Sequence, residues 1–468
     1  MWAVTFLFAF TLLVVYFSAD VSCRDGSDII IDKAVQYPEP APSTTERKQS
    51  RYRTEINRLS VADRPAHDWY RFVLSYPPHL VRDYLKRFGV NQQHQVLDPF
   101  CGTGTTIVEC KKLGIPGVGV EANPMARLAS QLKVDWTPDP DALLAHAVKV
   151  ADATQGAIAK YGKERLTLPE ESFKLLLANS ISPLPLHKTL VLQEQLQQHH
   201  DQRYSGHESL ALAKALVSTI SNLHFGPEVG VGAAKTDAPV VDAWLREVET
   251  IARDLPELQK LPSTPTIAYH ADSRQISQIL APRSIDAVIT SPPYPNEKDY
   301  TRTTRLETVL LGFIHNRAEL QALKRGLVRS NTRNVYKTDD DDQWVASHAE
   351  IQRIAATIEA RRIELGKTSG FERMYARVTK LYFGGMAKHL AELRTVLRPG
   401  AQLAYVVGDQ ASYLRVMIRT GQLLAEIAQV LGYELVSIDL FRTRLATATK
   451  EQIREEVVVL RWLGDRAD

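Results

Sequence analysis

Two short segments combine residue types that could bind a ligand and act on it chemically. The first is Asp98–Thr106 (DPFCGTGTT), in which Gly102 and Gly104 separate a short apolar run from a helix-like stretch. Glycine allows a tight turn and a close approach of backbone to ligand, so this segment predicts a binding loop. The second is Thr290–Tyr294 (TSPPY), which ends the apolar run Ile285–Thr290.

The glycine loop is compatible with a dinucleotide, a nucleoside triphosphate or S-adenosylmethionine. A phosphate-binding loop of the G-x-x-x-x-G-K-[ST] type requires a lysine that this segment lacks. A dinucleotide loop requires a third glycine, but that position holds Ile107, which hinders close helix–strand packing. Glu121 follows Asp98 by 23 residues and ends the next apolar run, where a carboxylate can accept hydrogen bonds from both ribose hydroxyls. A glycine turn without a ligand is the alternative interpretation.

The Ser-Pro-Pro-Tyr loop favours a planar substrate that carries an amino group. Two consecutive prolines restrict the backbone and remove two N–H donors. What remains is a rigid set of acceptors, the Ser291 hydroxyl and the Pro292 carbonyl, beside the aromatic ring of Tyr294. The acceptors could hold the hydrogens of an exocyclic amino group while the ring stacks on the substrate. A proline-rich turn that only caps a strand is the alternative.

Apolar runs around the two segments predict the elements that position them. We expect a turn at 397–400, helices near 78–88, 105–113 and 416–431, and strands near 95–97, 118–120, 266–271, 285–290 and 402–407. The last two strands, 433–441 and 455–462, are close enough in sequence to pair as an antiparallel hairpin. The pattern predicts an α/β protein built on a βαβ unit, with its ligands at the carboxyl ends of the strands.

Taken together, the two segments resemble the S-adenosylmethionine-dependent DNA amino-methyltransferases of restriction–modification systems, and Ser-Pro-Pro-Tyr resembles their cytosine-N4 subgroup. The resemblance covers roughly 65–136 and 264–463, with a looser match of Trp69–Phe88 to a cofactor-side motif. It implies a Rossmann-like class I methyltransferase sheet, mostly parallel with an antiparallel C-terminal strand, plus helical insertions. The family's motifs match a cofactor loop at Asp98, Phe100, Gly102 and Gly104, a ribose-binding acid at Glu121, an adenine-contacting acid at Asp272 with Ser273 beside it, and a catalytic loop at Ser291, Pro292, Pro293 and Tyr294.

On this interpretation the chain divides into six segments. They are 1–50 (an apolar stretch and flexible linker outside the fold), 51–136 (the first part of the core, with the cofactor loop), 137–262 (a helical insert), 263–300 (core with the catalytic loop), 301–395 (a charged helical segment) and 396–468 (the C-terminal part of the core). Target recognition could belong to 137–262 or to 310–375.

The resemblance implies transfer of a methyl group from S-adenosylmethionine to cytosine N4 in duplex DNA. The target nucleotide must be flipped out of the helix, and stacking on Tyr294 would offset part of that cost. Methylation at cytosine carbon 5 needs a cysteine that follows a proline, and neither Cys101 nor Cys110 does. The alternatives are adenine-N6 methylation, RNA guanine-N2 methylation, and a non-catalytic nucleic-acid-binding protein that retains the fold.

Basic residues follow the catalytic loop and could contact DNA phosphates. The stretch 298–337 holds nine Lys or Arg and three Asp or Glu, a net charge of +6. The candidate phosphate contacts are Arg302, Arg305, Lys324, Arg325, Arg329 and Arg333. The acidic run 339–342 is expected to face away from DNA. The histidines near 199–207 match no recognised metal-ligand spacing, so no metal site is predicted.

Overall composition is typical of a soluble globular protein, apart from an apolar N-terminal segment. The 468 residues are 44% hydrophobic and 24% charged, with a net charge of +3, and three cysteines are too few for a disulfide framework. Met1–Ala19 carries no charge and is just long enough to span a bilayer. We expect it to be an extension that is dispensable for activity, with no stable membrane association; an N-terminal membrane anchor and a signal peptide are the alternatives. The cofactor and DNA imply a cytoplasmic protein, with a cognate restriction endonuclease as a functional partner.

Overall fold

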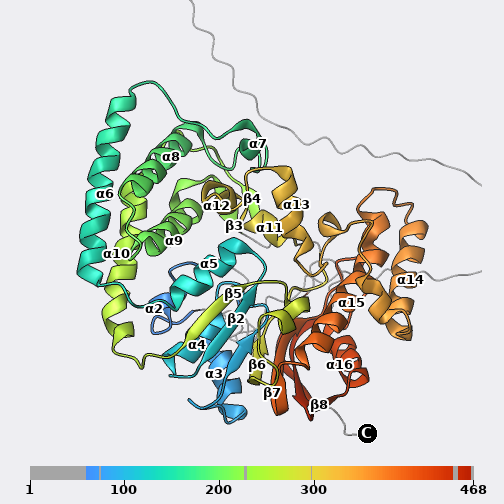
Figure 1. Cartoon of the computed structure of the whole chain (residues 1–468). Helices are drawn as coiled ribbons and strands as arrows, with labels where there is room; N and C mark the ends of the chain where they lie inside the picture. Colours follow the sequence, from blue (N-terminus) through green and yellow to red (C-terminus); the bar gives the residue numbers. More distant parts are fainter. Residues whose placement is uncertain (1–58, 73–74, 226–228, 297, 446–451, 465–468) are drawn as a thin grey trace, which may run out of the picture. The chain divides into compact units, whose positions relative to one another are not determined.

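The computed structural model describes residues 59–464 except 73–74, 226–228, 297 and 446–451 (Figure 1). The apolar run and the linker predicted for 1–50 lie outside the described residues. Within the described part, no helix combines the length and apolar character needed to cross a membrane.

The apolar runs of the sequence form one sheet with the strand order β5-β2-β1-β6-β7-β9-β8. The strands are β1 (Val96–Asp98), β2 (Gly117–Glu121), β5 (Thr266–His270), β6 (Ile285–Thr290), β7 (Leu397–Gly408), β8 (Tyr433–Leu445) and β9 (Gln452–Trp462). Neighbours from β5 to β7 pair in parallel, whereas β9 pairs antiparallel with both β7 and β8. This mostly parallel sheet with an antiparallel C-terminal strand confirms the predicted fold class.

The strand order brings the two motif strands side by side. β1 pairs with β6 through Val96 opposite Ala287 and Leu97 opposite Val288, although these partners are 191 positions apart in sequence. Parallel neighbours end at the same edge of a sheet, so the glycine loop after β1 and the Ser-Pro-Pro-Tyr loop after β6 emerge together. The site therefore depends on this one pairing.

Helices cover both faces of the sheet. Alternate residues of a strand point to opposite faces. One face, with Leu97, Val288 and Leu403, packs against helices on the C-terminal side of the chain. These helices are α14 (Ala349–Glu364), α15 (Tyr375–Leu393) and α16 (Thr420–Val430). The other face, with Val96 and Ile289, packs against α3 (Pro78–Arg87) and α4 (Thr105–Lys112).

The segment 137–262 is largely helical, as the periodicity predicts, and shares a core with the N-terminal Trp69 and with α5 (Pro124–Lys133). Its helices are α6 (Pro140–Tyr161), α7 (Glu170–Phe173), α8 (Pro183–Gln198), α9 (Ser205–Ala215), the π-helical turn η1 (Leu216–Ile220) and α10 (Val240–Gln259). The periodicity did not predict a two-stranded hairpin, β3 (Leu223–Phe225) with β4 (Val229–Val231), between η1 and α10.

Three features go beyond the expectations. The predicted turn at 397–400 is an irregular start of β7, where pairing with β6 jumps from Leu397 to Gln402 and Gly400 adopts a φ of +91°. The charged helical segment 301–395 also contributes to the core, because α15 is largely buried. Within the acidic run, Asp341 is buried and pairs with Arg274 at 2.5 Å.

The remaining helices of 301–395 are short and lie between the sheet edge and the insert in Figure 1. They are α11 (Tyr300–Thr303), α12 (Arg305–Leu310) and α13 (Arg317–Arg325), followed by the short helical turns η3 (Thr332–Asn334), η4 (Asp341–Val345) and, just before α15, η5 (Glu372–Met374). N-terminal to the sheet, α2 (Arg64–His67) is a short turn against α4.

Candidate active site

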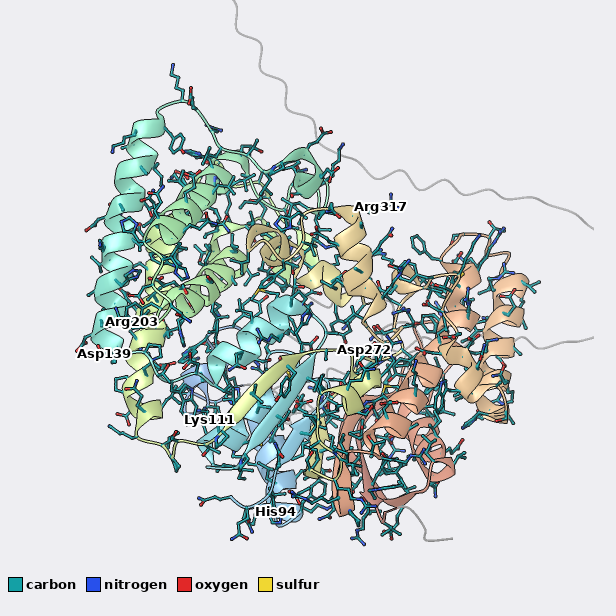
Figure 2. All side chains as sticks on the ribbon, viewed as in Figure 1. His94, Lys111, Asp139, Arg203, Asp272 and Arg317 are labelled. Atoms are coloured by element: carbon teal, nitrogen blue, oxygen red, sulfur yellow. The ribbon has the colours of Figure 1, made fainter. Side chains whose placement is uncertain are left out.

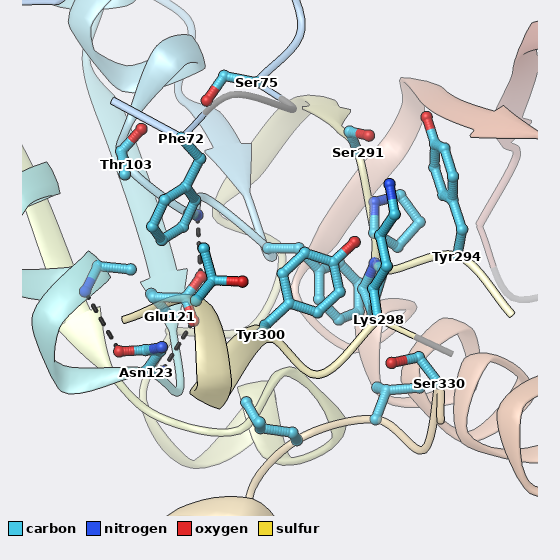
Figure 3. A pocket seen from close by; sticks show the side chains of 18 of the residues that line it. Phe72, Ser75, Thr103, Glu121, Asn123, Ser291, Tyr294, Lys298, Tyr300 and Ser330 are labelled. Carbon is cyan, nitrogen blue, oxygen red and sulfur yellow. Dashed lines mark hydrogen bonds between the residues drawn. The ribbon is translucent and has the colours of Figure 1, made fainter. Parts of the chain in front are cut away.

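A cavity of about 560 Å³ opens where the carboxyl ends of β1, β2 and β6 meet. Its walls include Gly102 of the glycine loop, Glu121 at the end of β2, and the whole Ser291–Tyr294 loop. Figure 3 shows Glu121 with Phe72 and Tyr300 at one end of this cavity, and Ser291 with Tyr294 at the other. The two predicted motifs thus line one space.

The glycine loop is shaped by two left-handed residues. Gly102 has a φ of +52° and Gly104 a φ of +86°, a region that other L-residues rarely adopt. A side chain on Gly104 would come within 3.1 Å of the backbone of Ser130 in α5. The Ser130 hydroxyl donates to the Gly102 carbonyl at 2.6 Å, so α5 supports the turn from behind.

Glu121 is oriented by backbone donors on both sides. Its Oε2 accepts the Gly102 N–H at 2.9 Å and its Oε1 accepts the Asn123 N–H at 2.8 Å. Burial raises the pKa of Glu121 to about 7. Each carboxylate oxygen can accept more than one hydrogen bond, so the acceptor capacity left over faces the cavity.

Asp98 lies beneath the cavity rather than on its wall. It is fully buried and accepts hydrogen bonds from the Thr290 hydroxyl at 2.6 Å and the Tyr76 hydroxyl at 2.8 Å. Burial raises the pKa of Asp98 to about 6. The carboxyl ties the end of β1 to the end of β6, and thereby the glycine loop to the residue before Ser291.

The Ser-Pro-Pro-Tyr loop presents acceptors to the cavity. The Ser291 hydroxyl donates to the Val406 carbonyl of β7 at 3.1 Å, which leaves its oxygen lone pairs as acceptors. The Tyr294 ring is half-buried and packs against Gly408, where a Cβ would approach its Cε2 to 3.1 Å. Burial raises the pKa of Tyr294, so its hydroxyl stays neutral.

The carboxylate of Asp272, the predicted adenine-contacting acid, binds Arg274 instead of facing the cavity. Asp272 follows β5 (Figure 2), and its carboxylate pairs with Arg274 at 2.7 Å and accepts the Arg274 N–H at 2.9 Å. Arg274 also pairs with Asp341, and together these carboxylates raise its pKa. Ser273 and Ala271 line the cavity, whereas Asp272 is not part of the wall.

The six candidate phosphate contacts separate into two groups. Arg305 is buried and donates to the carbonyls of Thr301 and Leu175, Lys324 pairs with Asp299 at 2.9 Å, and Arg329 pairs with Asp339 at 2.9 Å. These three cations are committed to internal partners, which argues against the predicted phosphate contacts. Arg302 and Arg333 line the cavity, and Arg325 is exposed beside the Tyr336 ring.

Several wall residues were missed by sequence reasoning. Phe72, Ser75 and Tyr76 come from the segment before α3, and the loose motif match at Trp69–Phe88 was the signal for them. Asn123 caps α5, where an asparagine followed by Pro124 is a helix start that could have been recognised. Other missed wall residues include Lys298, Tyr300, Thr303, Glu307, Ser330 and Asn334.

The two cysteines among the described residues are held as packing residues. Cys101 lines the cavity but is only 4% exposed, and its sulfur lies where a side chain on Gly119 would come within 2.8 Å. Burial raises the pKa of the Cys101 and Cys110 thiols, which disfavours the nucleophilic thiolate.

The sequence is similar to those of known DNA methyltransferases. A family model described as DNA methylase matches residues 32–131. Type II methyltransferase M.BsoBI from Geobacillus stearothermophilus is 24% identical over 440 residues, covering 84% of each chain. Type II methyltransferase M.AvaI from Anabaena variabilis is 22% identical over 414 residues, covering 80% of each chain. M.MjaII from Methanocaldococcus jannaschii is 34% identical over 68 residues, 14% of this chain and 13% of its own.

The sheet order, the shared cavity and these similarities support the assignment of a S-adenosylmethionine-dependent DNA methyltransferase. Within that class the resemblance to amino-methyltransferases of the restriction–modification type is confirmed. S-adenosylmethionine is the methyl donor of this class, and the cavity fits it, because the glycine turn and the Glu121 carboxylate form a cradle beside the aromatic Phe72 and Tyr300.

Proposed function

We propose that this protein methylates the exocyclic N4 amino group of cytosine in duplex DNA. The observation that carries the proposal is the position of the Ser291 oxygen. Its proton is directed to the Val406 carbonyl, so the oxygen itself is free to accept a hydrogen from an amino group. The Pro292 carbonyl, on the same rigid loop, is a second acceptor.

The chemistry follows from how these residues would hold a flipped base. Tyr294 stacks on the ring, which offsets roughly 1–3 kcal/mol of the cost of unstacking it. Ser291 and Pro292 accept the two amino hydrogens and thereby direct the nitrogen lone pair toward the glycine-loop end of the cavity. Bound S-adenosylmethionine supplies a sulfonium-activated methyl group there. The nitrogen forms its new bond to carbon as the carbon–sulfur bond breaks, and the amino group then releases one proton to solvent.

This reaction needs no covalent intermediate on the protein. Positioning two reactants in line supplies much of the rate without one. The neutral, buried thiols of Cys101 and Cys110 are consistent with that mechanism.

Adenine N6 is the second candidate, because the matched family model covers both N6 and N4 methylases. Both bases offer an amino group next to a ring nitrogen, so the same acceptors suit either. The deciding experiment incubates the purified protein with unmethylated duplex DNA and labelled cofactor, then analyses the nucleosides by mass spectrometry. We expect N4-methylcytosine. N6-methyladenine as the product would overturn the subtype, and DNA binding without methylation would overturn the activity.

The catalytic loop can be tested separately from cofactor binding. We expect Ser291→Ala and Tyr294→Ala to lower the methylation rate by about tenfold or more while the affinity for S-adenosylmethionine stays unchanged, because one hydrogen bond or one stacking contact is worth about 1–3 kcal/mol. Ser412→Ala, another small polar change on the cavity wall, is the matched control. Normal rates in both loop variants would refute the assignment.

The DNA backbone is proposed to contact Arg302, Arg325 and Arg333, the three candidates that form no ion pair with another described residue. We also propose a restriction endonuclease of the same target sequence as functional partner, and the cytoplasm as the compartment. Genomic DNA methylated by this protein should resist that endonuclease, and an unprotected target site would count against the partnership.

A further inference from the structure

One ion pair on the cavity wall has no role in the reaction described above. Arg442 of β8 donates from its Nε to the Glu455 carboxylate of β9 at 2.5 Å, and both residues line the cavity. The Arg442 side chain is 23% exposed, so a ligand in the cavity can reach it. Among the described residues, Glu455 alone accepts a hydrogen bond from this guanidinium. The donors on its two Nη atoms therefore stay available to a ligand.

The strand order places this ion pair on the same sheet edge as the catalytic loop. The loop follows β6, and the strands beyond it are β7, β9 and β8 in that order. Gly408 of β7 pairs with Glu455, and Glu455 pairs with Arg442. Three steps of about 4.8 Å between strands put β8 roughly 14 Å across the sheet from β6. A base bonded to Ser291 and a long arginine side chain would bridge that span together.

Tyr294 lies between Ser291 and the ion pair. A Cβ on Gly408 would come within 3.1 Å of Tyr294 Cε2 and 3.4 Å of Glu455 Cγ, so both side chains flank the same glycine. Burial raises the pKa of Tyr294, Glu455 raises it further and Arg442 opposes the rise, which fits two opposite charges close to the phenol. A base that stacks on Tyr294 with its amino group at Ser291 therefore turns its other polar edge toward Arg442.

That other edge differs between the two candidate bases. In cytosine, the ring nitrogen N3 and then the carbonyl oxygen O2 follow the carbon that bears the amino group, and both are acceptors. In adenine, the ring nitrogen N1 is followed by a C–H group, which accepts no hydrogen bond. A donor aimed at the position of O2 thus favours cytosine, because a site built to bond one polar group discriminates against a base that lacks it.

We propose that Arg442, oriented by Glu455, donates a hydrogen bond to O2 of the flipped cytosine and so selects cytosine over adenine. The inference rests on the proposed function and deepens it, since it names the residue that distinguishes the two bases. Glu455 holds the guanidinium through Nε and offsets its charge, which leaves directed donors in place of a general attraction for phosphate.

The test compares two duplexes that differ at the target base. The modified sites are first mapped by sequencing methylated DNA, and a short duplex is then made with cytosine or with paired adenine at the target position. Dissociation constants are measured with S-adenosylhomocysteine bound. Arg442→Met, which keeps most of the length but no donor, should weaken binding of the cytosine duplex about tenfold or more and leave the adenine duplex unchanged. The rate of cytosine methylation should fall with it.

A neighbouring ion pair provides the matched control. Arg454 pairs with the buried Glu456 at 2.9 Å, also on β9, and does not line the cavity. Arg454→Met should bind both duplexes as the wild type does. Should Arg442→Met fold poorly because Glu455 has lost its partner, the double variant Arg442→Met/Glu455→Gln removes that charge, and the same contrast between duplexes is expected.

The outcomes separate this inference from the proposed function. Equal weakening of both duplexes would overturn the inference, and a lower salt dependence in that case would assign the arginine to a DNA phosphate. Unchanged binding and rate with the cytosine duplex would overturn it as well. Wild-type protein that methylates only adenine would instead overturn the proposed base, whereas cytosine methylation without the contrast in Arg442→Met refutes the role of Arg442 alone.

Discussion

Replacing Glu121 by glutamine tests the cofactor cradle at its most connected residue. The carboxylate uses separate oxygens to accept the N–H groups of Gly102 and Asn123, at 2.9 Å and 2.8 Å. A glutamine amide has one oxygen and one NH₂ group. Whichever way it turns, one backbone N–H then faces a donor instead of an acceptor.

The cost follows from that geometry. A hydrogen bond to a charged group contributes about 1.5–3 kcal/mol, and an unsatisfied buried donor costs about 1–3 kcal/mol. Either the Gly102 N–H in the loop or the Asn123 N–H at the start of α5 would lose its hydrogen-bond acceptor. The ribose hydroxyls would also meet a neutral acceptor. We therefore expect the dissociation constant for S-adenosylmethionine to rise roughly 10–100-fold, since about 1.4 kcal/mol corresponds to a factor of ten.

Isothermal titration calorimetry measures this directly. Glu434→Gln, an exposed glutamate on β8, is the matched control and should bind as the wild type does. A second signature is pH-dependent: because the pKa of Glu121 is raised to about 7 and the carboxylate is the better acceptor, wild-type affinity should increase as the pH rises through 7. The variant should lack that dependence. Equal affinity of variant and wild type at pH 8 would refute the cradle.

Three further outcomes are expected. Arg333→Ala should weaken DNA binding and lower the salt dependence of binding by about one counterion. Arg329→Ala should instead lower the unfolding temperature, because the Asp339 carboxylate, whose side chain is largely shielded from solvent, would lose its ion-pair partner. Burial raises the pKa values of Asp98 and Glu121 to about 6 and 7. Their contribution to the free energy of unfolding is therefore complete below the unfolded-state pKa values near 4 and is lost as the pH rises through 6–7. In denaturant titrations, the stability of Glu121→Gln relative to wild type should increase progressively from about pH 5 to about pH 8. Cys101→Ala should retain methylation measured by nucleoside analysis, and loss of activity in a folded variant would contradict a mechanism without a covalent intermediate.

Much of the fold and site could be predicted from local sequence, because the relevant preferences are local. Gly102 and Gly104 adopt left-handed backbone angles that favour glycine wherever they occur, and Pro292 and Pro293 restrict their own backbone. Short apolar runs identify the buried strands because a strand covered on both faces has no polar side. These signals located the two loops and predicted an α/β sheet with an antiparallel end.

Other features could not be predicted, because they depend on distant partners. Arg329 and Arg333 belong to the same basic run, yet one is buried against Asp339 and the other lines the cavity. No property of the run distinguishes them. Likewise, Asp272 matches an acid of the family motif, but in the fold its carboxylate is paired with Arg274, which in turn pairs with the acidic run.

The sequence alone determined which chemistry the two loops can support, since rigidity, acceptor atoms and an aromatic ring are properties of the residues themselves. The tertiary structure decided that the loops act together. The pairing of β1 with β6 joins residues 191 positions apart in the chain, and Asp98 accepts a hydrogen bond that links one strand end to the other. It also decided that Glu307, an ordinary glutamate in a charged segment, lies fully buried and accepts a hydrogen bond from the Tyr70 hydroxyl. Burial and hydrogen-bond satisfaction arise only when distant segments pack, so no local pattern records them.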